Sequence, residues 1–303
     1  MNQTDTSQQT ALRVMHRTRY DYAEPVSLSL HQAMLKPRIL PRQAVANSYL
    51  NIEPTPRSLD FRVDYHGNLV SYFELDSPHR ELVVTATSEV YLTASVPPDF
   101  TISSPLEQIA ARLAAPQSDE EFTASEFLAV SPYAPRSERL ANYGRDLFWP
   151  GRPYLDGVYE LMQKIHAEFR YDPEVTTIST PVASVLANKC GVCQDYAHVM
   201  IACLRSLGGP ARYVSGYLVP RPGVVGDQAS HAWVSAFCPE LGWVDFDPTN
   251  DIVPTDGHVT LAWGRDDSDV SPLRGVIFGG GEHDIKVAVA ISRLASTPAA
   301  PLA

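Results

Sequence analysis

The sequence predicts an α+β protein, in which an N-terminal antiparallel β domain precedes a core of helices packed on an antiparallel sheet. Strand-like alternation dominates up to about residue 97, a helical period follows, and three further strand patterns come after the helices. We place the β-rich domain at residues 10–97 and the core at residues 98–295. Residues 296–303, "STPAAPLA", have the composition of a disordered tail.

The N-terminal domain is predicted from its strand patterns and its turn residues. The stretch from Leu82 to Val96, "LVVTATSEVYLTASV", alternates and is rich in β-branched residues. Gly67 and Asn68 separate two strand-like runs, which is typical of a turn. Helices are disfavoured here by prolines at positions 25, 37, 41, 54 and 56.

The core begins with helical patterns at residues 104–114 and 137–149. The clearest helix is expected over residues 155–171, where five apolar residues share one face: Val158, Leu161, Met162, Ile165 and Phe169. A short helix follows at residues 180–189, with Thr180 as its expected N-cap and Pro181 at its first position.

The stretch "NKCGVCQDYAH" places Cys190 and Cys193 three residues apart at the start of the next helix. A helix beginning at Cys193 directs its N–H groups and its positive dipole end at that thiol, which favours the reactive thiolate. Cys190 lies outside the helix and gains less. His198 and Asp195 are about 140° and about 200° around the axis from Cys193, so a base must come from another element.

A predicted hairpin supplies that base. The strand patterns at residues 230–238 and 242–249 flank the turn "PEL" and carry His231 and Asp247. A tight turn gives an even sum of paired residue numbers, which puts both side chains on one face within roughly 4.5–8 Å of each other. A carboxylate beside an imidazole fixes its tautomer and stabilises the imidazolium, as the third member of a catalytic triad does.

Three motifs resemble the core of bacterial transglutaminase-like proteins of the papain-like superfamily: "GVCQDYAHVMIACLRSLGGPARYVSGYL", "SHAWVSAF" and "GWVDFDPTN". The β-rich N-terminus is similar to that family's N-terminal domain through "YDYAEPV" and "DYHGNLVSYFEL". The resemblance implies a transglutaminase-like core with Cys193, His231 and Asp247 as the catalytic residues. Two features depart from the family pattern: Cys190 is not in its motif, and Asp267 stands where an aromatic residue is usual.

The expected function is cysteine-dependent acyl transfer at an amide or peptide carbonyl, through a thioester acyl-enzyme. A peptidase or amidase is the first expectation, and a true transglutaminase that uses an amine acceptor is the alternative. A more remote alternative is a thiol-disulfide oxidoreductase, which predicts a Cys190–Cys193 disulfide but leaves His231 and Asp247 unexplained. A non-enzymatic scaffold is a further alternative. Zinc would need two more suitably spaced ligands, so no metal and no cofactor is expected.

Composition limits the partners and the location. The chain has 303 residues and a formal net charge of −11, which disfavours nucleic acid and anionic membranes as partners but does not name a partner. A peptide or protein amide is expected as the partner because the expected reaction is acyl transfer at an amide carbonyl. The polar start "MNQTDTSQQT" resembles no secretory signal, and no apolar run approaches the ~18 residues of a membrane span. We therefore expect a cytoplasmic protein with reduced thiols. The sequence leaves the oligomeric state open.

Several other residues have structural interpretations. His198 is expected to be a packed or half-buried residue of its helix, and Cys203 and Cys238 fall on apolar faces. Trp233 and Trp243 share the parity of His231, so they wall the cleft or pack in the core. The run at residues 279–281 is a glycine turn rather than a phosphate loop.

Overall fold

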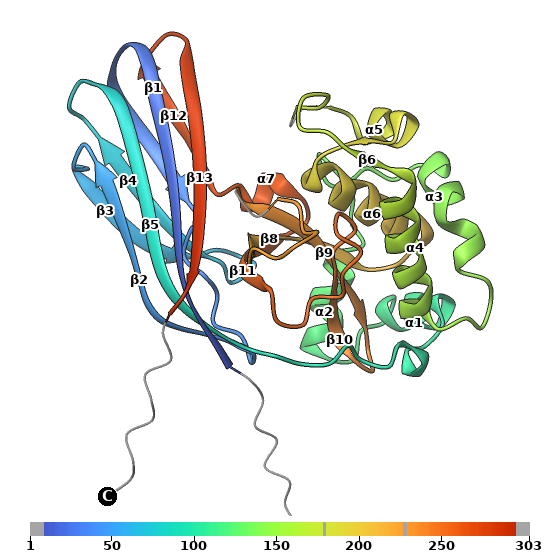
Figure 1. The fold of residues 1–303 in the computed structure, drawn as a ribbon. Coiled ribbons are helices and arrows are strands. Elements are labelled where there is room, and N and C mark those ends of the chain that lie inside the picture. Colours follow the sequence, from blue (N-terminus) through green and yellow to red (C-terminus); the bar gives the residue numbers. More distant parts are fainter. Residues whose placement is uncertain (1–8, 178–179, 227–228, 295–303) are drawn as a thin grey trace, which may run out of the picture.

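The computed structural model describes residues 9–177, 180–226 and 229–294, which form a tall β-sheet unit beside a mixed core (Figure 1). The tall unit is an antiparallel sheet in the order β2-β5-β1-β4-β3, with two more strands paired to β1. Its strands are β1 (Gln9–Ala33), β2 (Gln43–Glu53), β3 (Ser58–Val63), β4 (Leu69–Leu75), β5 (His79–Thr93), β12 (Leu273–Gly279) and β13 (His283–Arg293).

The long strand β1, with 25 residues, organises the sheet and corrects the predicted domain boundary. Its first half pairs with β5 and β13, and its second half with β4 and β12. The assignment of residues up to 295 to the core was therefore wrong, because β12 and β13 return to the N-terminal sheet. A strand pattern shows which faces alternate but not which edge the strand will join. The predicted tail, 296–303, lies outside the described residues.

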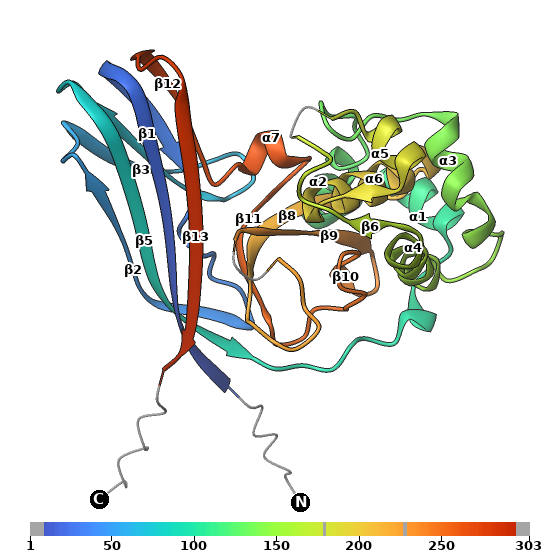
Figure 2. The same ribbon diagram turned by 45° about the horizontal axis from the view of Figure 1, so that its top comes forward.

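The core contains a four-stranded antiparallel sheet in the order β10-β9-β8-β11. The core strands are β8 (Ala211–Leu218), β9 (His231–Cys238), β10 (Gly242–Phe246) and β11 (His258–Gly264), with a short parallel pair β6 (Arg170–Tyr171) and β7 (Cys190–Gly191). The helices are α1 (Leu106–Leu113), α2 (Asp119–Glu126), α3 (Glu138–Gly144), α4 (Tyr154–Glu168), α5 (Val182–Asn188), α6 (Cys193–Leu207) and α7 (Asp267–Val270). Helices α3, α4, α5 and α6 lie away from the N-terminal strands, whereas the short α7 lies between those strands and the core (Figure 2).

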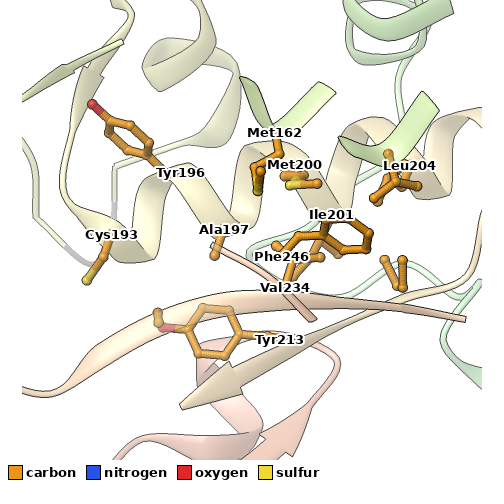
Figure 3. Packing of buried hydrophobic residues seen from close by; sticks show 14 of the residues in the cluster. Met162, Cys193, Tyr196, Ala197, Met200, Ile201, Leu204, Tyr213, Val234 and Phe246 are labelled. Carbon is orange, nitrogen blue, oxygen red and sulfur yellow. The ribbon is translucent and has the colours of Figure 1, made fainter. Parts of the chain in front are cut away.

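Helix α6 is the central element of the core, as Figure 3 shows. Met200 lies in one cluster with Met162 of α4 and with Val234 and Phe246 of the core sheet. Truncating such a side chain to alanine typically costs about 2–5 kcal/mol. The helix ends as predicted, at Gly208 with a left-handed φ of 93°.

Two helix predictions need adjustment. Pro181, rather than Thr180, is the N-cap of α5. Helix α2 was not predicted, although Ser118 caps it in the ordinary way by accepting a hydrogen bond from the Glu121 N–H. Within residues 9–177, 180–226 and 229–294, no helix has both the length and the apolar composition needed to cross a membrane.

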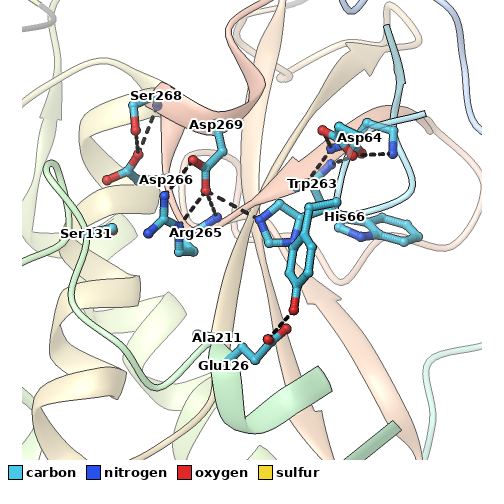
Figure 4. A network of polar contacts seen from close by, with 12 residues as sticks. Asp64, His66, Glu126, Ser131, Ala211, Trp263, Arg265, Asp266, Ser268 and Asp269 are labelled. Carbon is cyan, nitrogen blue, oxygen red and sulfur yellow. Dashed lines mark hydrogen bonds and ion pairs between the residues drawn. The ribbon is translucent and has the colours of Figure 1, made fainter. Parts of the chain in front are cut away.

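A turn of the N-terminal sheet, residues 64–68, fixes that sheet to the core (Figure 4). The fully buried amide of Asn68 donates to the backbone carbonyl of Trp263 and accepts from its N–H, at 2.9 and 3.0 Å. His66 lies 3.6 Å from Asp269 of α7. Because one amide satisfies both backbone groups of a residue in β11, this turn sets the position of that strand.

Candidate active site

The start of α6 is built around Cys193, its first residue. The side chain of Asp195 accepts hydrogen bonds from the Val192 N–H at 2.9 Å and from Thr176 Oγ1 at 2.7 Å. Val192 has no polar side chain, so only this reciprocal half of a capping box is present. A Cβ on Gly191 would lie 2.4 Å from Asp195 Oδ2. The glycine and aspartate of "GVCQD" therefore shape the helix start that holds the thiol.

The two cysteines of this motif have different surroundings. Cys190 lies in β7, where its sulfur accepts a hydrogen bond from Arg170 Nη2 at 3.5 Å. All four cysteines are unpaired. Cys203 and Cys238 are fully buried, as predicted, and burial raises the pKa of the Cys238 thiol to about 11.

The β9–β10 hairpin has the predicted even register, since Val234 pairs with Phe246. Asp247 follows β10 and is therefore one diagonal step from His231. His231 Nε2 lies 2.9 Å from Asp247 Oδ2. The same diagonal step brings Trp233 Nε1 to Asp245 Oδ2 at 3.1 Å, so the two aspartates have different partners.

Asp247 is fully buried and accepts hydrogen bonds from several groups. Its Oδ1 accepts from the N–H of Thr249 at 3.0 Å and from that of Asn250 at 3.3 Å. Its Oδ2 accepts from Asn250 Nδ2 at 2.9 Å and from His258 Nε2 at 3.1 Å, as well as from His231. Burial opposes its charge, but the two imidazoles hold the pKa of this carboxyl well below its usual range. Asp247 is thus a fixed anion.

His231 is buried, and its ring is held from one side only. Burial alone would lower its pKa, but Asp247 and Cys193 reverse this and raise the pKa of His231 to about 10. Its Nδ1 has no hydrogen-bond partner of good geometry among the described residues. Because Cys193 contributes to the pKa rise by charge and by hydrogen bonding, the thiol lies near this ring. A sulfur–nitrogen distance within about 4 Å stays a prediction.

Comparisons with known proteins agree with this architecture. Residues 12–91 match the family model of the bacterial transglutaminase-like N-terminal region, and residues 143–248 match that of the transglutaminase-like superfamily. An uncharacterized protein of Mycobacterium tuberculosis is 36% identical over 282 residues, which cover 90% of this chain and 89% of the relative. The chain belongs to the transglutaminase-like superfamily.

Two more distant similarities are to a solved structure and to part of an enzyme. A crystal structure of a candidate cysteine protease from Cytophaga hutchinsonii has a TM-score of 0.76 at 20% identity, covering 96% of this chain and 92% of that one. A protein-glutamine gamma-glutamyltransferase of Pseudomonas aeruginosa is 27% identical over 128 residues, which are 34% of this chain and 19% of that protein. The first likeness shows the fold alone.

Sequence reasoning missed two partners of the transglutaminase-like site, His258 and Asn250. His258 starts β11, at the far edge of the core sheet in strand order. Asn250 bonds Asp247 and also accepts from the Val225 N–H at 2.8 Å, so it fixes the loop beside His231. Asn250 lies in the quoted stretch "GWVDFDPTN" but was not singled out, and no local pattern indicated His258.

One group of side chains has the donor set of a metal site. The ligand atoms of His231, Asp247 and His258 lie within 4.8 Å of one another. Two imidazoles and a carboxylate suit zinc. The same atoms already satisfy each other through hydrogen bonds of 2.9 and 3.1 Å. A bound cation would displace the protons of these two hydrogen bonds and would therefore compete with the contacts between Asp247 and the two imidazoles.

His198 of α6 packs against Asp267 of α7. His198 Nε2 accepts a hydrogen bond from the Asp267 N–H at 3.2 Å, and the ring stacks on Tyr213 at 5.0 Å. Burial lowers the pKa of His198 to about 4, as expected for a neutral packed histidine. Burial also raises the pKa of Asp267 to about 6, while the Tyr213 hydroxyl donates to it at 3.4 Å. Asp267 is therefore a buried neighbour of α6.

The two tryptophans of the hairpin differ in role. Trp233 is fully buried, with its ring 6.2 Å from that of His231 and 5.0 Å from that of His258. Trp243 lines a cavity between the core sheet and the N-terminal domain. Trp233 thus packs in the core beside His231 and His258, and Trp243 lines the cavity between the two domains.

Proposed function

We propose that the protein is a cysteine-dependent enzyme that attacks amide or peptide carbonyl groups through Cys193, His231 and Asp247. One observation carries the proposal. His231 bonds the buried carboxylate of Asp247 at 2.9 Å, its Nδ1 has no partner of good geometry among the described residues, and Cys193 at the start of α6 helps to raise its pKa. This is the arrangement of a nucleophile, a base and an orienting group.

The reaction would proceed in two steps. The Cys193 thiolate attacks the carbonyl carbon, and the imidazolium of His231 gives its proton to the departing amine, which leaves a thioester. His231, now neutral, then takes a proton from the incoming acceptor as the acceptor attacks the thioester, and Cys193 is released. The backbone N–H of Cys193 has no acceptor within its own helix, so it can stabilise the oxyanion.

Water is the first candidate for the acceptor, because it needs no binding site, and it would make the protein a peptidase or amidase. Transfer to an amine is the second candidate, favoured by the similarity to the glutamyltransferase of P. aeruginosa. Both reactions use the same triad and thioester. We also expect the enzyme to work in a reducing compartment such as the cytoplasm, since its four cysteines are unpaired.

The test is a peptide library incubated with the protein under reducing conditions, with and without an added primary amine, and read by mass spectrometry. Hydrolysed or deamidated products that need Cys193 support the hydrolase, and amine adducts support the transferase. The matched control is Cys203→Ala, since Cys203 is a buried cysteine on the same helix. A correctly folded protein that gives no Cys193-dependent product with any peptide would contradict the proposal.

A further inference from the structure

A cavity of about 460 Å³ lies between the N-terminal domain and the core sheet. The N-terminal domain contributes residues 40–43 and Leu92, and the core sheet contributes Arg212, Trp243 and Trp263. Small-molecule sites in proteins typically have volumes of about 300–1,000 Å³. The cavity is therefore large enough for a small organic ligand.

Arg212 is the unusual group in its wall. The side chain is buried, and its guanidinium lies 4.1 Å from the ring centroid of Trp243 and 3.8 Å from that of Trp263. It forms no hydrogen bond or ion pair with any residue that the structure describes, and its Nε is completely buried without a partner. A buried cation without a hydrogen-bonded partner is costly, so such groups normally hold a counter-charge.

Among the described residues, no carboxylate forms an ion pair with Arg212. Asp245 and, more weakly, Glu120 favour the charged guanidinium from beyond ion-pair distance, and the Asp245 carboxylate accepts the indole N–H of Trp233. Ser235 pairs with Arg212 across β8 and β9, and its fully buried hydroxyl also has no hydrogen-bond partner among the described residues. Arg38 lies 3.4 Å from the ring centroid of Trp263 but outside the cavity lining, and its guanidinium donates to the Asn68 side chain. The guanidinium of Arg212 in this wall of the cavity is therefore available to bind an anion.

We propose that the cavity binds a small organic carboxylate, with its anionic group on the guanidinium of Arg212 and its carbon skeleton against Trp243 and Leu241. The planar fork of an arginine matches a carboxylate with two parallel hydrogen bonds. Glu120, Asp245 and Asp256 also line the cavity, which disfavours a multiply charged anion such as phosphate. The proposal concerns a second site and does not depend on the proposed function.

One residue both lines the cavity and contacts the proposed triad. His258 lines it, and the same imidazole bonds Asp247 at 3.1 Å. A ligand that moves His258 changes one of the hydrogen bonds that orient Asp247 and, through it, His231. Occupation of the cavity is therefore expected to alter the reactivity of Cys193.

The experiment uses the full chain and two probes of equal shape, sodium benzoate and neutral benzamide, with inorganic phosphate as a third. Binding is followed by calorimetry and by tryptophan fluorescence, in the wild type and in Cys193→Ala, which separates binding from turnover. We expect benzoate to bind and to quench fluorescence, with benzamide and phosphate each at least about tenfold weaker, because only a carboxylate uses the arginine fork.

The variant test is Arg212→Lys, which keeps the charge but loses the planar fork, and the matched control is Arg139→Lys on the exposed surface of α3. Benzoate affinity should fall about tenfold in the first and stay unchanged in the second. Should Arg212→Lys fail to fold, the comparison of benzoate with benzamide in the wild type decides. Equal binding of the two, tighter binding of phosphate, or no binding of benzoate at millimolar concentration would overturn the proposal.

Discussion

His231 and His258 both place Nε2 against one oxygen, Asp247 Oδ2, at 2.9 and 3.1 Å, from strands at different positions in the core sheet. One carboxylate thus bonds two imidazoles, and Cys193 contributes to the raised pKa of the first, His231. The second fixes the orientation of the carboxylate. This division of roles distinguishes a proposed catalytic histidine from a positioning one.

The first prediction concerns His258. His258→Ala should lower kcat/KM about tenfold, since Asp247 would lose one of the donors that orient it. His258→Gln keeps a donor and should restore most of the activity. A merely structural role would make both variants equally unstable and leave the pH profile of the remaining activity unchanged. Thermal melts and pH–rate profiles of the two variants separate these cases.

The second prediction separates the two cysteines. Cys193→Ala should abolish amide turnover, whereas Cys190→Ser should keep most of it, because Cys190 lies outside the helix, in β7, where it contacts Arg170 of β6. Iodoacetamide at neutral pH should label Cys193 first. The assays need a reductant to prevent a disulfide between the two. If both variants were equally inactive under reducing conditions, the pair would act as a unit and the redox interpretation would return.

The third prediction concerns the loop beside His231. A Cβ on Gly226 would lie 2.8 Å from His231 Nδ1, and the residue has a φ of +87°. Gly226→Ala should therefore lower kcat strongly, whereas its melting temperature should fall only a little. Gly223→Ala is the matched control, because Gly223 has a similar φ of +82° and open space around it. Equal losses of activity in the two variants would mean that backbone strain, and not contact with the imidazole, is responsible.

The fourth prediction concerns pH. The pKa of His231 is raised to about 10, so its imidazolium persists at neutral pH and is lost as the pH rises through that value. The alkaline limb of kcat/KM should lie well above pH 7. The same shift adds stability that is fully present below pH about 6.5 and lost as the pH approaches 10.

Asp247→Asn tests the cause of this shift. Without the carboxylate, burial dominates, so the alkaline limb should move to lower pH, and kcat should fall by about 10⁴ as the tautomer is lost. Asp245→Asn is the control, because Asp245 bonds Trp233 and not His231. If the alkaline fall of kcat/KM occurred at the same pH in Asp247→Asn as in the wild type, Asp247 would not be the proposed partner of His231.

The sequence predicted the helix start at Cys193 and the register of His231 with Asp247 because both follow from local rules. Helical period, stop residues and strand parity act over fewer than about twenty residues. His258 could not be found in this way, since its contact with Asp247 depends on how β11 lies beside β8. The cavity at Arg212 could not be predicted from the sequence either, because its walls come from two domains and from segments far apart in the chain.

The strand that completes the N-terminal sheet is made last. Leu12 of β1 pairs with Arg293 of β13, so this pairing can form only after the whole core has been synthesised. Contacts so distant in sequence form slowly, and an unpaired strand edge is prone to association with other chains. On the ribosome, the core with Cys193 can therefore be folded while β1 still lacks β12 and β13. Protection of that edge by a chaperone during translation would benefit this architecture more than one whose strands pair with their neighbours in sequence.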